Sequence, residues 1–212
     1  MKTKFHINIG RQVGAGGLVI GKKLSNILSI PYFDKELINI ASHKSGIDKE
    51  FFKNADEAPN KFKTSLLDVG FGTGLGITNY RTDNIIGSDN LFNIQSDVIK
   101  EEASKGSAIF IGRCADYILR ESKNTLNVFI YADLKDRIER IKRAKLINYR
   151  ELSDSKLGEI IKKEDKKRAE YYNYYTFKKW GDKESYHICL DSSKLGIDMC
   201  VQIIELYVKN IL

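Results

Sequence analysis

The sequence predicts an α/β fold in which helices cover both faces of a central parallel sheet. Short apolar segments such as SAIFIG (107–112) and LNVFIYAD (126–133) are typical of buried strands, and amphipathic segments of helical period separate them. Strands that alternate with helices favour a parallel sheet, because each crossover helix packs back onto the sheet. The length of 212 residues fits a single domain.

The first part of the chain predicts two strand–helix pairs. Residues 5–10 (FHINIG) alternate apolar and polar side chains, as a strand does, and residues 16–28 carry apolar side chains on one helical face. Residues 30–34 (IPYFD) predict a short strand. The following segment, 35–46, has helical character, and Gly46 is a suitable place for that helix to end.

The middle of the chain changes character. Residues 48–57 (DKEFFKNADE) form an acidic helical stretch, and residues 58–90 are rich in Gly, Asn, Thr and Asp with weak periodicity. This composition predicts a loop or a loosely packed insertion. A helix resumes at Ser96 or Asp97, either of which suits an N-cap, and ends at Gly106.

The remaining elements continue the alternation. They are a strand at 107–113, a short helix at 115–122, a strand at 126–133, a densely charged helical region from Leu134 to about Trp180, a strand at 185–191 and a closing amphipathic helix at 197–212.

Composition narrows the class of protein. Thirty-five basic and 28 acidic residues give a net charge of +7, which suits polyanionic partners such as nucleotides, although a lysine-rich solvated surface is the plainer explanation. Three widely spaced cysteines and three scattered histidines predict neither a disulfide framework nor a metal centre. No apolar run approaches the roughly 18 residues of a membrane span, so we expect a cytoplasmic protein.

The glycine-rich segment GRQVGAGGLVIGKKL (10–24) directly follows the first strand. It resembles the phosphate loop G-x-x-x-x-G-K-[S/T], in which backbone N–H groups and a helix N-terminus hold phosphates. Gly17 and Leu18 replace the lysine and the hydroxyl residue of that pattern. A cradle of N–H groups survives these replacements, because it needs small residues, whereas the lysine charge and the hydroxyl ligand for magnesium are lost.

Two other glycine patterns compete with the phosphate loop. A dinucleotide-binding fingerprint fits Gly14 and Gly16, with Asp34 at the distance of a ribose-binding acid, but Val19 replaces its third glycine. LLDVGFGTGLG (66–76) matches the loop of S-adenosylmethionine-dependent methyltransferases, and IIGSDN (85–90) resembles their second strand. The segment between these two motifs is too short and polar for the helix which that fold requires.

Several ordered segments together resemble the cytidylate kinase-like family, a branch of the P-loop nucleoside monophosphate kinases that commonly lacks the loop lysine. They are INIGRQVGAGGLVIGKKLSNILSIPYFDKELI (7–38), IFIGRCADYIL (109–119), FIYADLKDRIERIKR (129–143), KKEDKKRAEYYNYYTFKKWG (162–181) and CLDSSKLGID (189–198). The resemblance implies a P-loop NTPase-type three-layer domain, with an acceptor-binding insertion at about 35–95 and a helical lid at about 134–180.

The same resemblance implies a phosphotransferase that moves the γ-phosphate of ATP to CMP or dCMP and uses Mg²⁺. Nucleotides are then the partners, neither a membrane nor a nucleic acid is expected, and a homodimer stays open. A catalytically weak or inactive nucleotide-binding protein of the same fold is the alternative, because the loop lacks its lysine. Lys162 also occupies a position where the family has an acidic residue.

Carried over residue by residue, the resemblance implies two groups of ligands around the loop. Gly14, Ala15, Gly16 and Gly17 would offer backbone donors to the ATP phosphates. Arg11, on the same loop, could supply part of the charge of the missing lysine.

The resemblance also implies an acceptor site. Asp34 and Arg113 would contact the acceptor, Arg113 through its phosphate. Asp116 is a candidate for magnesium or for orienting Arg113. Both aspartates also suit helix caps, which is the plainer explanation for Asp116.

The charged helical region supplies the remaining candidates. Arg140 and Arg143 match lid arginines that close over the phosphates. Asp165 and Arg168 form a D-x-x-R pair, which matches the family's lid-side pair that contacts nucleotide or acceptor phosphate. The alternative for all four is a solvated helix with i to i+4 ion pairs. The tyrosines at 171, 172, 174 and 175, with Trp180, could stack nucleic-acid bases, but packing of the lid helix onto the body is the favoured interpretation.

Overall fold

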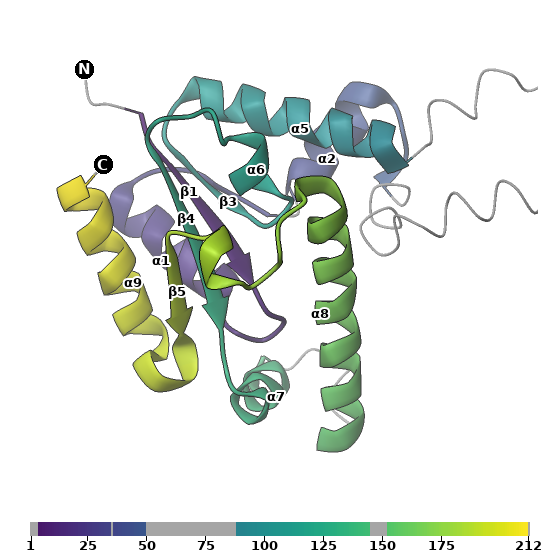
Figure 1. Cartoon of the computed structure of the whole chain (residues 1–212), viewed down its shortest axis with the longest axis vertical. Coiled ribbons are helices and arrows are strands. Elements are labelled where there is room, and N and C mark those ends of the chain that lie inside the picture. The colour runs from purple at the N-terminus through teal and green to yellow at the C-terminus, as the bar shows by residue number, and fades with distance from the viewer. Residues whose placement is uncertain (1–3, 35, 50–87, 145–151, 212) are drawn as a thin grey trace, which may run out of the picture.

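A five-stranded, all-parallel sheet runs through the centre of the molecule (Figure 1). The computed structural model describes residues 4–34, 36–49, 88–144 and 152–211. The strands are β1 (His6–Arg11), β2 (Tyr32–Phe33), β3 (Ala108–Ile111), β4 (Thr125–Tyr131) and β5 (Ile188–Asp191), in the spatial order β2-β3-β1-β4-β5. β1 is therefore the central strand, with β3 and β4 on either side of it.

Helices connect the strands. In the described part of the chain they are α1 (Gly17–Leu28), α2 (Glu36–Ser45), α5 (Ser88–Lys105), α6 (Ala115–Ile118), α7 (Leu134–Arg143), α8 (Asp154–Thr176) and α9 (Ser192–Ile211). A 3₁₀ turn, Lys183–Ser185, precedes β5.

The two faces of the sheet have separate apolar cores. On one face, Ile7 and Ile9 of β1 pack with buried side chains of α1 and α9. On the other face, Phe110 of β3 and Phe129 of β4 pack with buried side chains of α2, α5, α6 and α8. Figure 1 shows these helices on opposite sides of the strands. The predicted three-layer α/β fold with a parallel sheet is confirmed.

The register brings the carboxyl ends of the three inner strands to one edge. Ile9 of β1 lies beside Ile111 of β3 and Val128 of β4. Because parallel strands all point the same way, Arg11 at the end of β1 and the Gly112–Arg113 pair after β3 meet at this edge. Ligands of open α/β sheets bind outside the carboxyl ends of the strands.

Tyrosines of α8 attach this helix to α5. The rings of Phe92 and Tyr175 stack with centroids 4.0 Å apart, and Tyr171 contacts Tyr175 edge to face at 4.9 Å. Tyr171 and Tyr172 are buried in the same core. These contacts agree with the interpretation that the tyrosines pack the helix onto the body.

Helix α5 begins earlier than the sequence predicted. The expected N-cap at Ser96 or Asp97 is wrong, because the helix starts at Ser88, and residues 88–90 are helical rather than part of a loop or a second strand. Leu91, Gln95 and Val98 are buried on one helical face, and the Ser96 hydroxyl donates to the Phe92 carbonyl inside the helix. Polar residues between these positions obscured the period.

Several predictions fall on residues 50–87, outside the described part of the chain. They are most of the acidic helical stretch 48–57, most of the loop 58–90 and the glycine-rich segment 66–76. The acceptor-binding insertion at about 35–95 therefore stays a prediction.

In the described residues of the charged region from Leu134 to Trp180, α7 and α8 are separate helices. α7 ends at Arg143, and α8 begins after Ser153, whose hydroxyl accepts from the Lys156 N–H at 3.3 Å. The closing helix α9 starts with a turn at Ser192 and is interrupted at Gly196, which has a φ of 75°. Among the described helices, none has the length and apolar character to cross a membrane.

Candidate active site

The glycine-rich segment forms a loop between the end of β1 and the start of α1. Gly14 and Gly16 have φ values of 77° and 89°, a left-handed conformation that is unfavourable for other residues. Gly16 is the N-cap of α1, so the loop leads directly into a helix N-terminus. The first N–H groups of a helix have no partner within it and point outward, which makes them suited to an anion.

The outer side of the loop is covered by the start of α9. The buried Ser192 hydroxyl donates to the Ala15 carbonyl at 2.8 Å, and the Ile197 side chain occupies the space that a side chain at Gly16 would need. Arg140 donates to the Ser192 hydroxyl and to the Ser192 carbonyl, both at 2.8 Å. Arg140 thus contacts the loop through Ser192.

The other lid arginine lies apart from the loop. Arg143 has a side chain that is 78% exposed, and it pairs with Glu139 at 3.0 Å on the surface of α7. It does not line the pocket described below.

The inner side of the loop is held by a buried ion pair. Asp165 of α8 accepts from the Val13 N–H at 2.8 Å, and its other oxygen pairs with Arg137 of α7. Arg137 also donates to the Val13 carbonyl at 3.3 Å. Sequence reasoning singled out Asp165 as a nucleotide contact and missed Arg137.

Three half-buried arginines from three elements converge at the carboxyl edge of the sheet. Arg11 ends β1, Arg113 follows β3, and Arg168 lies on α8. Arg11 pairs with Asp34 at 3.2 Å, and Arg168 donates to the Arg11 carbonyl at 3.1 Å. Asp34 acts on all three guanidinium groups, and Asp165 and Glu164 also act on Arg168. The pocket lining still has an excess of positive charge, because Arg11, Arg113, Lys167 and Arg168 face only Asp116 and Glu164.

The pKa values of all three arginines are lowered, chiefly by burial. Burial, followed by the charge of Arg168, lowers the pKa of Arg11 to about 9, while Asp34 acts in the opposite direction. Burial is also the first cause that lowers the pKa of Arg113 and of Arg168. A bound anion would relieve this cost, because it favours the charged form of each guanidinium.

Two glycines make room for Arg11. A Cβ on Gly17 would lie 2.7 Å from the Arg11 Cβ, and a Cβ on Gly112 would collide with the Arg11 Nη1. The side chain of Arg11 therefore crosses the loop beside Gly17, the position of the missing lysine, and ends against Gly112.

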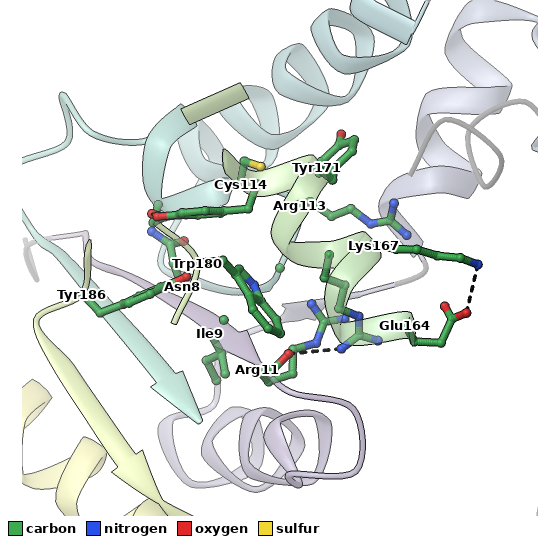
Figure 2. Close-up of a pocket in the computed structure, with 15 residues that line it drawn as sticks. Asn8, Ile9, Arg11, Arg113, Cys114, Glu164, Lys167, Tyr171, Trp180 and Tyr186 are labelled. Carbon is green, nitrogen blue, oxygen red and sulfur yellow. Dashed lines mark hydrogen bonds and ion pairs between the residues drawn. The ribbon is translucent and has the colours of Figure 1, made fainter. Parts of the chain in front are cut away.

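The three arginines line a pocket with a volume of about 280 Å³. Figure 2 shows Arg113 and Lys167 toward one side of this pocket, Tyr186 toward the other, and Trp180 between Tyr186 and Arg11. The wall thus combines cationic groups with aromatic rings. Such a combination suits a ligand that has both an anionic group and a planar ring.

Asp116 lies at the inner end of the pocket and is 6% exposed. Its carboxylate accepts from the Tyr172 hydroxyl at 2.7 Å, and burial raises its pKa. Within the described ranges, no group of three or more His, Cys, Asp or Glu side chains could hold a metal ion.

The structure brings most of the predicted site residues together. Arg11, Arg113, Arg168 and Asp116 line one pocket, with Asp34 paired to Arg11 and the glycine loop adjoining through Arg11. Sequence reasoning missed Arg137, Ser192, Gly112 and Tyr186. Arg137 lies three positions before Arg140 on the same helix, so spacing groups these two arginines but does not show which of them meets the loop.

The comparisons with known proteins bear on the family and the fold of the chain. Residues 6–194 match the model of the cytidylate kinase-like family. An uncharacterized protein from Eubacterium ventriosum is 25% identical, with a TM-score of 0.69 over 98% of this chain and 99% of that one. Shikimate kinases from Bacteroides thetaiotaomicron and Acinetobacter baumannii are 14% and 16% identical.

The Bacteroides shikimate kinase has a TM-score of 0.53, over 98% of this chain and 99% of that one. The Acinetobacter enzyme has a TM-score of 0.51, over 100% of this chain and 97% of that one. Both share the fold. No curated protein matches the sequence. Because the family match covers nearly the whole chain and the fold is that of P-loop kinases, the protein belongs to the cytidylate kinase-like family.

Proposed function

We propose that this protein transfers the γ-phosphate of ATP to CMP or dCMP. Membership of the family supports a phosphotransferase with a nucleotide-binding fold. The observation that carries the proposal is the arginine cluster of Arg11, Arg113 and Arg168, which adjoins the glycine loop at the carboxyl edge of the sheet. A donor cradle beside a cationic acceptor pocket is the arrangement that phosphoryl transfer requires.

In this proposal the ATP phosphates bind the N–H groups at the start of α1, and the acceptor phosphate binds the arginine cluster. An oxygen of the acceptor phosphate attacks the γ-phosphorus while the bond to the β–γ bridging oxygen breaks, which yields ADP and a nucleoside diphosphate. The protein contributes alignment and charge neutralisation rather than covalent chemistry. Trp180 and Tyr186 offer apolar ring surfaces to the rest of the acceptor.

The loop segment 10–24 contains no carboxylate or hydroxyl side chain that could bind magnesium. Leu18 stands where a hydroxyl residue would coordinate the ion, and Asp34 and Asp165 are engaged with arginines. These residues do not form the usual magnesium site of a phosphate loop. The described side chains act instead through positive charge, and Mg²⁺ characteristically keeps water and phosphate oxygens as ligands.

The proposal is tested by ADP release from ATP and Mg²⁺ with CMP, dCMP, UMP, AMP and GMP as acceptors. We expect turnover with CMP or dCMP and an acceptor KM raised about 10- to 100-fold in Arg113→Ala, as for the loss of a charged hydrogen bond. The KM for ATP should change little. Arg120→Ala is the matched control, because Arg120 is half exposed and outside the pocket.

A second function is kept open by one observation, the absence of a lysine and a hydroxyl at Gly17 and Leu18. A nucleotide-binding protein without turnover would retain the loop and the pocket. Trp180 is the only tryptophan and lines the pocket, so its fluorescence reports binding directly. Fluorescence changes with CMP but no ADP above the blank with any monophosphate would favour this second function over the kinase.

A further inference from the structure

The buried ion pair of Arg137 and Asp165 holds both backbone polar groups of one residue of the glycine loop, Val13. The side chains are 6% and 12% exposed. Asp165 accepts from the Val13 N–H at 2.8 Å, and Arg137 donates to the Val13 carbonyl at 3.3 Å. Both backbone groups of Val13 are thus held by the same pair, and the pair joins α7 to α8.

The backbone of α7 also meets the loop directly. A Cβ on Gly14 would lie 2.8 Å from the Arg137 carbonyl oxygen and 3.0 Å from the Arg137 Cβ. Gly14 has a φ of 77°, which favours glycine independently. The path of the loop at residues 13 and 14 is therefore shaped by Arg137 through its side chain and its backbone.

The partner helix α8 carries one wall of the pocket. Asp165 and Arg168 are three residues apart and lie on one helical face. Asp165 contacts the loop at Val13, and Arg168 donates to the Arg11 carbonyl at 3.1 Å while lining the pocket. Lys167, Tyr171 and Tyr172 of the same helix also line the pocket. One helix thus anchors the loop and presents a pocket cation.

Stability alone does not explain a buried pair at this position. Taking two charges out of water is costly, and well-packed apolar residues often serve a protein core as well or better. The specific property of this pair is directional, because it fixes the backbone of Val13 relative to Arg168. Phosphoryl transfer depends on such alignment, and small displacements of reacting groups reduce rates strongly.

We propose that Arg137 and Asp165 are positioning residues that tie the shape of the phosphate loop to the position of Arg168, so that binding at the loop and binding in the pocket are coupled. This inference rests on the proposed function, in which the loop takes ATP and the pocket takes the acceptor. Neither residue contacts the reacting atoms. Their effect is to let occupation of the loop strengthen occupation of the pocket, and the reverse.

The test measures coupling and turnover separately. Trp180 fluorescence gives the affinity for CMP with and without a non-hydrolysable ATP analogue, and ADP release gives kcat. For the wild type we expect the analogue to tighten CMP binding at least about fivefold, at the lower end of usual coupling. In Asp165→Asn, CMP affinity without the analogue should stay within about twofold, the coupling factor should fall to about one, and kcat should fall about tenfold or more.

A double variant separates positioning from stability. Arg137→Met with Asp165→Leu replaces the ion pair by apolar side chains, and its thermal midpoint should lie near that of the wild type. Coupling and kcat should stay low in this variant, because nothing then holds Val13. The matched control is Asp154→Asn, which breaks the exposed Lys142–Asp154 pair, also between α7 and α8 but away from the loop. It should behave as the wild type.

The outcomes distinguish the two proposals. Recovery of coupling and kcat together with stability in the double variant would make the pair merely structural and overturn the inference, as would full coupling in Asp165→Asn. A wild type that turns over with a coupling factor of one also overturns the inference while leaving the proposed function intact. Coupling without ADP release supports the inference and overturns the proposed transfer.

Discussion

The guanidinium group of Arg11 rests against the Cα of Gly112, in the space that any side chain at residue 112 would occupy. The stem of the same arginine crosses Gly17, and its Nη2 pairs with Asp34 at 3.2 Å. Arg11 therefore fills the volume beside the position of the missing lysine but directs its charge toward Gly112 and Asp34. The loss of the lysine and the presence of Arg11 are sterically linked.

Restoring the lysine should therefore reduce function rather than improve it. In Gly17→Lys, the new Cβ would lie 2.7 Å from the Arg11 Cβ, so one of the two side chains must move. Overpacking of this kind costs about 1–3 kcal/mol. We expect a lower thermal midpoint and weaker CMP binding by Trp180 fluorescence.

The double variant Arg11→Gly with Gly17→Lys tests this steric link. It removes the collision, so its thermal midpoint should recover relative to Gly17→Lys, with a coupling energy of about 0.5–3 kcal/mol in a double-mutant cycle. Gly106→Lys is the control, because nothing lies within 4 Å of a Cβ at Gly106. Additive effects of the two substitutions would contradict the link.

Binding of a phosphate-bearing ligand should weaken above pH 8. The pKa of Arg11 is lowered to about 9 by burial and by Arg168, so its charge is largely present at pH 7.5 and largely lost at pH 9.5. The affinity for CMP should fall about fourfold over this interval if binding needs the charged form.

Raising the pH through the pKa of Arg11 should weaken CMP binding but increase the contribution of Arg11 to stability. Binding and unfolding measurements therefore respond in opposite directions. A lowered pKa means that the unfolded chain binds this proton more tightly, so the contribution of Arg11 to the unfolding free energy rises with pH above about 9. Arg11→Met is the control and should bind CMP weakly, with no comparable decline. A wild-type affinity that is flat between pH 7.5 and 9.5 contradicts the prediction.

Removal of the Tyr172 hydroxyl should destabilise the protein more at neutral pH than at acidic pH. This hydroxyl donates to the buried Asp116, whose pKa is already raised by burial. In Tyr172→Phe the carboxylate loses the donor that lowers its pKa, at a cost of about 1–3 kcal/mol. Protonation at lower pH removes part of this cost, because the neutral acid tolerates burial.

Urea unfolding at pH 5.5 and pH 8 measures this difference. Tyr175→Phe is the matched control, since its hydroxyl makes a long, exposed contact of 3.4 Å with Asp89. The control should change the unfolding free energy little at either pH. An equal loss at both pH values in Tyr172→Phe would show that Asp116 is not the group that responds.

Phe177→Gly should stabilise the protein. Phe177 follows α8 with a φ of 55°, a left-handed conformation, and its side chain is 90% exposed. Glycine removes the left-handed penalty and little packing is lost, so we expect a gain of about 0.5–1 kcal/mol. Phe177→Ala keeps the Cβ and should give no such gain. The thermal midpoints of the wild type, Phe177→Gly and Phe177→Ala test this prediction.

The order of strands and helices was largely predictable because the chain alternates apolar strands with amphipathic helices. The start of α5 was not, since the buried face of Leu91, Gln95 and Val98 includes a polar residue and lies within a polar stretch. Ser96 was a reasonable N-cap by residue type, but its hydroxyl bonds within the helix. Local preference failed there because the Ser96 hydroxyl can bond within a helix as well as cap one.

The candidate site also contains residues that the sequence predicted and residues that it did not. Arg113 was predictable because an arginine after an apolar strand lies at the carboxyl edge of the sheet, and the structure has it there in the pocket. Arg137 was not singled out, although Arg140 and Arg143 on the same helix were. Spacing identifies which residues share a helical face, but it does not say which face meets the loop.

The sequence by itself determined the α/β class, the parallel sheet and the glycine loop, because these follow from apolar periodicity and from the freedom of glycine backbones. Only the tertiary structure decided which charges meet. Arg11 at the end of β1 meets Gly112, which follows the neighbouring strand β3, and Asp34, which follows β2 one strand further away. Asp165 of α8 contacts Val13, which lies 152 residues away in the chain. Such contacts depend on how helices pack on the sheet, and no local pattern in the chain encodes them.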